Sequence, residues 1–144
     1  MKKLLSLLAV ALIYAGLNAQ TPVAATQDFN QRYNNVQASW ASEGNYWVAS
    51  FQANNELQQA FYLHDGTWAG TETPSQLTQM SAPAQDFVNT RFIQAQNGYT
   101  FVKAVNRQET EKNYHVAYLS MDSGRTLKLF FDTEGQLVRR EISQ

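Results

Sequence analysis

One short phrase occurs twice in this chain, and it restricts the fold more than any other feature of the sequence. Residues 45–51 read NYWVASF and residues 113–119 read NYHVAYL, with Asn-Tyr first and Val-Ala at the same offset. Both phrases are rich in the β-branched and aromatic residues that favour strands. A strand phrase that recurs this far along the chain predicts two similar halves; a chance match between short β phrases is the alternative.

Each half is predicted to begin with a helix. In the first half Ala25, Phe29 and Tyr33 recur at every fourth position, which places them on one helical face. In the second half Ala84 and Val88 have the same spacing, after a proline that suits a first helical turn. The two predicted helices span about residues 22–33 and 82–96.

After each helix the hydrophobic period falls to two, which is typical of strands, and turns containing Gly, Asn or Asp separate the runs. The two predicted repeats cover about residues 22–72 and 82–142, inside a single domain over residues 20–144. The tripeptide QDF occurs in both repeats, at residues 27–29 and 85–87. The predicted strands span residues 36–41, 45–53, 57–64 and 67–72, then 99–107, 113–121, 125–132 and 136–142.

Residues 1–19 are predicted to be a signal peptide. Lys2 and Lys3 precede an apolar stretch, and small residues follow up to Ala19. The apolar stretch is shorter than the roughly 20 residues that cross a bilayer as a helix. We therefore expect an exported, soluble protein of the periplasm or the extracellular space, without membrane insertion after cleavage. A membrane anchor or a buried first helix is the alternative for this segment.

Charge and cysteine content narrow the classes of partner. Residues 20–144 contain 9 Lys and Arg against 12 Asp and Glu, a balance that argues against a nucleic-acid partner. The chain has no cysteine, so an exported form must be held together by its core and not by disulfides. The oligomeric state stays open.

The order of these elements resembles the secreted PepSY-like proteins related to the β-lactamase inhibitory protein, over residues 24–141. The best local match is LFFDTEGQLVRRE at residues 129–141, where Phe131, Asp132 and Gly135 fall on the family pattern F-D-x-x-G. The first copy departs from that pattern at Leu63, where the family usually has Asp.

This resemblance implies an α+β fold in which two α-β-β-β-β repeats join into one antiparallel sheet with both helices on one face. It brings no catalytic residues with it. The inhibitor relative binds its target enzyme with the open, concave face of the sheet, so a protein or peptide partner in the cell envelope or outside the cell is implied here too.

The predicted strands carry aromatic residues on both of their faces, so the sequence leaves open which face meets the helices. We predict a partner-binding face formed by Tyr46, Tyr114 and Tyr118 and rimmed by Trp68, because aromatic side chains dominate contact surfaces. A core with rings on both sides of the sheet, or loops that cover the second face, is the alternative.

The sequence contains no motif for catalysis, a metal or a cofactor, and we expect a protein that is not an enzyme. There is no G-x-S-x-G, and His64 and His115 are interpreted as ordinary strand residues. Asp132 to Gly135 is better explained by a hairpin turn than by a calcium loop. The predicted function is an exported non-catalytic binding protein, with an inhibitor-like role as one form. A small-ligand or glycan carrier, or an enzyme without a known motif, is the alternative.

Overall fold

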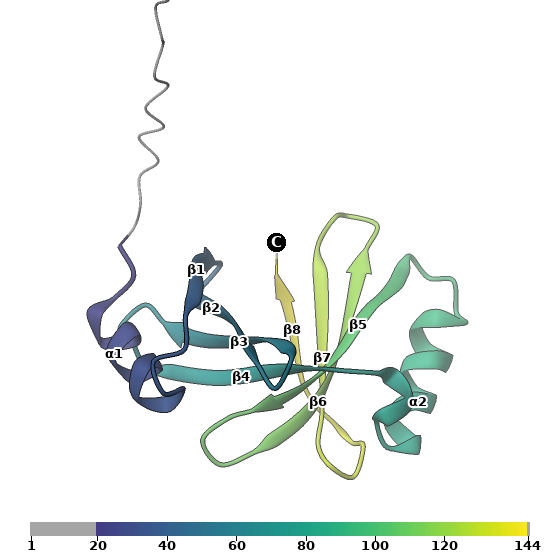
Figure 1. Ribbon diagram of the computed structural model, residues 1–144. Coiled ribbons are helices and arrows are strands. Elements are labelled where there is room, and N and C mark those ends of the chain that lie inside the picture. Colours follow the sequence, from purple (N-terminus) through teal and green to yellow (C-terminus); the bar gives the residue numbers. More distant parts are fainter. Residues whose placement is uncertain (1–19, 144) are drawn as a thin grey trace, which may run out of the picture.

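The eight strands form one antiparallel sheet in which every strand lies beside its neighbours in the sequence, from β1 to β8 (Figure 1). The computed structural model describes residues 20–143, so the predicted signal peptide at residues 1–19 lies outside the described residues. The strands are β1 Ala38–Glu43, β2 Tyr46–Ala53, β3 Glu56–Leu63, β4 Trp68–Ser75, β5 Tyr99–Gln108, β6 Asn113–Met121, β7 Thr126–Phe131 and β8 Leu137–Ser143.

A helix precedes each set of four strands. Helix α1, Val23–Arg32, buries Ala25 and Phe29 against β2 and β3. Helix α2, Ala82–Val88, buries Ala84 and Val88 against β5, β6 and β7. The prediction of eight antiparallel strands and two helices is confirmed. The second helix departs from it, since its α-helical part ends at Val88 and continues as a π-helical turn, η2, Asn89–Ile93.

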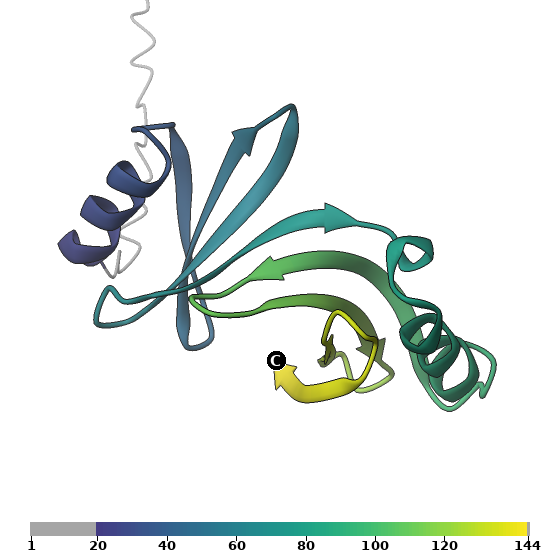
Figure 2. The same ribbon diagram turned by 90° about the horizontal axis from the view of Figure 1, so that it is seen from below.

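The strand register sorts the side chains onto two faces. Ala49, Ala60 and Thr71 are cross-strand neighbours on the side that packs on α1. Ala104 and Ala117 continue this side beneath α2. Both helices therefore lie on the outer side of the curved sheet (Figure 2). We call the other side the concave face; it carries Val48, Phe61, Glu72, Val105, Arg107, Val116, Tyr118, Lys128 and Phe130.

The concave face closes on itself around Phe61 of β3. The Phe61 ring centroid lies 4.8 Å from the guanidinium carbon of Arg107 in β5 and 5.5 Å from Nζ of Lys128 in β7. Strands this far apart in the sheet can meet only if the sheet curls strongly. The expectation of a bare second face is therefore wrong at its centre, where Phe61, Val116 and Phe130 are buried.

Two turn glycines lie against the two helices. Gly66, with φ of +91°, would place a Cβ 2.6 Å from Cβ of Ala24 in α1. Gly135, with φ of +90°, would place one 3.0 Å from the backbone nitrogen of Ala84 in α2. Each turn thus touches the helix that covers its own half of the sheet, and only glycine leaves room for that contact.

Candidate functional site

Three of the four predicted partner-binding residues share the concave face, and the fourth does not. Tyr118 and Tyr114 lie there beside Val116 and Phe130. Tyr46 lies there too, with its ring edge-on to Phe61 at 5.9 Å between centroids. The sequence alone left the face of these rings open, and the strand register now assigns it.

Trp68 lies on the helix-bearing side of the sheet. The prediction that it forms the rim of the surface with the three tyrosines is therefore wrong. A β-bulge between Phe61 and Tyr62 shifts the register and pairs Trp68 with Tyr62, which faces α1. The indole Nε1 donates a hydrogen bond to Oγ1 of Thr71 at 3.2 Å. The guanidinium of Arg32 in α1 stacks over the ring at 4.1 Å.

Tyr118 is a buried support of the concave face and not an exposed contact. Only 7% of its surface is exposed. Its hydroxyl donates to the carboxylate of Glu72, 2.6 Å from Oε2. Burial and the negative charge of Glu72 raise the pKa of Tyr118 above its ordinary value, so the phenol stays protonated.

An ionic network, which we call the buried network, continues from this carboxylate. Arg107 Nη1 donates to Glu72 at 2.9 Å, and these two side chains are 4% and 2% exposed. Arg107 Nε also donates to Glu109 at 2.9 Å, and Arg139 Nη2 reaches the same carboxylate at 2.7 Å. The network joins β4, β5 and β8 across the concave face.

Reasoning from the sequence alone did not identify the buried network. Charged side chains such as Glu109 and Arg139 are normally solvated, but here both are half-buried and paired with each other. The available signal was the spacing of two in Arg107/Glu109 and Arg139/Glu141, which places each pair on one strand face. Hydrogen bonds from Arg139 and Arg107 outweigh the effect of burial and hold the pKa of Glu109 below its ordinary value.

A groove remains open where the two ends of the sheet approach each other. It has a volume of about 950 Å³. One wall is formed by residues 42–46 in and around the β1–β2 turn and the other by residues 141–143 of β8, with Phe61 and Lys128 between them. We call it the edge groove. Of the four predicted residues, Tyr46 is the one that lines it.

Lys128 places a cationic group in the edge groove. Its Nζ lies 5.0 Å from the ring centroid of Tyr118. Burial lowers the pKa of Lys128, although the carboxylates of Glu72, Glu141 and Glu43 act in the opposite direction. The ammonium forms no ion pair within 4.0 Å with any residue that the structure describes.

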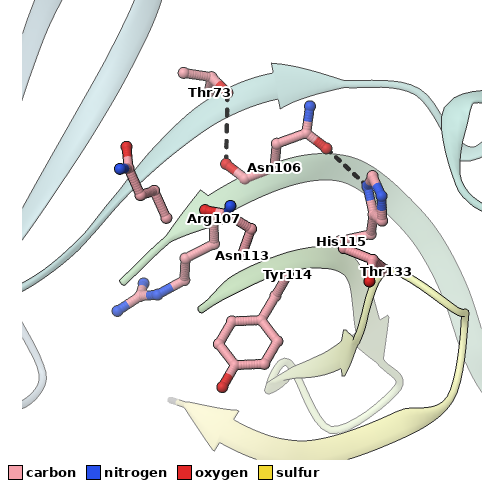
Figure 3. A pocket seen from close by; sticks show the side chains of 8 residues that line it. Thr73, Asn106, Arg107, Asn113, Tyr114, His115 and Thr133 are labelled. Carbon is pink, nitrogen blue, oxygen red and sulfur yellow. Dashed lines mark hydrogen bonds between the residues drawn. The ribbon is translucent and has the colours of Figure 1, made fainter. Parts of the chain in front are cut away.

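A smaller pocket of about 250 Å³ lies at β4, β5 and β6 (Figure 3). Thr73, Asn106 and His115 are cross-strand neighbours there, on the helix-bearing side of the sheet. Because an amide oxygen only accepts, Nδ1 of His115 donates to Oδ1 of Asn106 at 2.8 Å. His115 is thus a hydrogen-bonded strand residue, as its sequence position suggested.

Within residues 20–143 no group of three or more His, Cys, Asp or Glu side chains is arranged to hold a metal ion. Over the same residues, no helix has the length and apolar character needed to cross a membrane.

Several solved structures share this fold. No protein-family model matches the chain, and no curated protein matches it at a significant level. A BLIP-like protein from Bacteroides fragilis NCTC 9343 is 20% identical, with 88% of this chain and 89% of that chain covered and a TM-score of 0.57. A DUF2874 family protein from Bacteroides ovatus ATCC 8483 is 16% identical, with 85% and 88% covered and a TM-score of 0.59.

A third structure, from Bacteroides eggerthii DSM 20697, is named as a presumed periplasmic protein. It is 16% identical, with 85% of this chain and 89% of that chain covered and a TM-score of 0.60. At these levels of identity the likeness concerns the arrangement of the backbone. The chain therefore has the fold seen in BLIP-like and DUF2874 structures.

Proposed function

We propose that this chain is an exported, non-catalytic binding protein that docks a protein or peptide on the concave face of its sheet. Inhibition of a secreted or envelope enzyme is one form that such docking takes. The observation that carries the proposal is the edge groove, which leaves the half-buried ring of Tyr46 accessible on a face whose centre is otherwise closed.

The geometry favours the edge groove over the rest of that face as the contact point. A binding hot spot needs a large side chain that is accessible before docking and desolvated after it. Tyr118 is already buried and bonded to Glu72, so it cannot supply that change. Tyr46 is half-buried and lines the groove, and Tyr114, also half-buried, lies at a distance from it with its ring edge-on to Phe130.

We further propose that residues 20–144 are a single PepSY-like domain built from two helix-plus-four-strand repeats, preceded by a signal peptide at residues 1–19. The equivalent positions of Gly66 and Gly135 in the two halves support an origin by duplication. Both have φ near +90°, and each touches the start of the helix of its own half. The structure named as a presumed periplasmic protein supports export.

A comparison of matched variants tests the docking site. The exported protein is used to capture partners from an envelope extract of its source, beside Tyr46→Ala, Asn45→Trp and the control Leu57→Ala. Leu57 is 54% exposed and lies near the start of β3, away from the edge groove. We expect the same partner with the native chain and the control, and at least about tenfold weaker binding with the two groove variants. Equal binding by all four proteins would remove the proposed site.

A small-ligand or glycan carrier is the second candidate, and the size of the edge groove favours it. Pockets for small molecules measure about 300–1,000 Å³, and the groove falls within that range. A thermal-shift screen separates the two candidates. A small molecule that stabilises the native chain but not Tyr46→Ala supports the carrier, and a screen without one, beside a captured protein, supports docking.

A further inference from the structure

The two walls of the edge groove carry acidic side chains. Glu43, at the end of β1, is exposed and forms no ion pair within 4.0 Å with any residue in the described part of the chain. Glu141, on β8, lies 3.0 Å from Nε of Arg139. Lys128, the cross-strand neighbour of Glu141, is the cation among the lining residues.

The residues that line the edge groove carry more negative than positive charge. Glu43 and Glu141 supply two carboxylates, and Lys128 supplies one ammonium. Lys103, which lies over the ring of Tyr118, is exposed and does not line the groove. The lining therefore has an excess of one negative charge, and Glu43 is its exposed carboxylate at the mouth of the groove.

Other lining groups suit a cation on a long apolar stem. The half-buried ring of Tyr46 presents aromatic surface, and a cation over an aromatic face is attracted by the ring quadrupole. Asn45 and Ser143, which also line the groove, have side-chain oxygens that can accept hydrogen bonds. Arginine and lysine combine such a stem with a charged head that donates several hydrogen bonds.

From this arrangement we infer that the edge groove accepts a basic side chain, an arginine or a lysine, from a loop or extended segment of the partner protein. The inference rests on the proposed docking function and names the chemistry of the contact. The stem of the side chain lies along Tyr46, and its charged head meets Glu43. Glu141 is held on the opposite wall by Arg139 and contributes to the negative potential of the groove.

An acidic side chain fits the same groove poorly. Its natural counterpart would be Lys128, but Glu72, Glu141 and Glu43 already act on that ammonium. An added carboxylate would enter a lining that contains two carboxylates and one ammonium. Like-charge contacts of this kind oppose binding and give an interface its selectivity.

Two substitutions with opposite expected effects test the inference. Short random peptides displayed on a surface are selected for binding to the purified exported protein, and the peptides recovered are measured against variants. Glu43→Gln should lower the affinity for these peptides about tenfold. Lys128→Met removes a charge of the same sign as the basic side chain and should raise the affinity about threefold. Glu111→Gln, an exposed glutamate outside the groove, controls for a general effect of net charge and should change nothing.

The outcomes separate this inference from the proposed function. Peptides that contain Arg or Lys and follow both expected changes support a basic contact. Peptides that are lost with Tyr46→Ala but prefer Asp or Glu, or that ignore Glu43→Gln, overturn the basic contact and leave docking in place. Peptides that bind every groove variant as well as the native chain overturn both.

Discussion

The hydroxyl of Tyr118 lies 2.6 Å from Oε2 of Glu72, although 46 residues separate them in the sequence. Glu72 belongs to β4 and Tyr118 to β6, so the bond passes over β5, which lies between these strands. It thereby links strands from the two halves of the chain. A buried carboxylate needs such donors, because an unpaired charge removed from water is costly.

Loss of this one hydroxyl should be measurable. Tyr118→Phe keeps the ring but removes the donor to Glu72, and hydrogen bonds to charged groups contribute about 1.5–3 kcal/mol. We expect the free energy of unfolding to fall by that amount in urea denaturation. Tyr46→Phe is the control, since Tyr46 is half-buried at the groove and should lose less than about 0.5 kcal/mol. Equal losses of unfolding free energy in the two variants would contradict a stabilising hydrogen bond from Tyr118 to Glu72.

The buried pair of Arg107 and Glu72 should show strong non-additivity. Arg107→Met leaves the carboxylate of Glu72 buried without its guanidinium, which should cost about 3–5 kcal/mol. Glu72→Leu leaves the guanidinium in the same position with Glu109 as its remaining ionic partner. The double variant should therefore lose clearly less than the sum of the two single losses, as measured by denaturant midpoints. Simple additivity would show that the pair is not coupled.

The turn glycines give a test of the contacts between turns and helices. An alanine at Gly66 would meet α1 at Cβ of Ala24, and one at Gly135 would meet the backbone of Ala84 in α2. Gly44 also has a positive φ, of +58°, but a Cβ there has no neighbour within 4 Å. Gly44→Ala should cost about 1–2 kcal/mol from the backbone conformation alone.

At Gly66 and Gly135 the steric contact adds to that cost, so both alanine variants should melt at clearly lower temperatures than Gly44→Ala. Equal melting temperatures in the three variants would mean that the turns do not depend on close approach to the helices.

The strands and helices could be predicted because their signals are local. The period of two in residues 113–121 and the four-residue spacing of Ala25 and Phe29 are visible in the sequence, and both elements formed. The placement of Trp68 could not be predicted, since it depends on a register shift between β3 and β4, where Phe61 pairs with Gly70 but Tyr62 pairs with Trp68. A one-residue shift of register moves a side chain to the other face of a sheet.

The charged part of the concave face was missed for a similar reason. Arg107 pairs with Glu72, 35 residues away, and Glu109 pairs with Arg139, 30 residues away. Charged residues near a hairpin are normally solvated, and only the curl of the sheet buries these. The same curl brings Arg107 to the ring of Phe61 across the sheet, a contact that no local pattern indicates.

Glu109 should make the stability of the protein sensitive to acid. Its pKa in the folded chain lies below the ordinary value of 4.5, because hydrogen bonds from Arg139 and Arg107 favour the charged carboxylate. When the folded pKa is the lower one, the stabilisation is complete above the unfolded pKa and is lost as the pH falls through the folded pKa. Unfolding free energies of the native chain and Glu109→Gln should therefore converge between about pH 6 and about pH 3.

Glu111→Gln is the matched control for that titration, because Glu111 is exposed and has no ion pair with another residue in the range 20–143. The fall of its unfolding free energy at acid pH should follow that of the native chain. The difference between the native chain and Glu109→Gln should also shrink only slightly in salt, since a half-buried pair is screened less than an exposed one. A difference that stays constant from neutral to acid pH would show that the carboxylate of Glu109 is not stabilised by its two arginines.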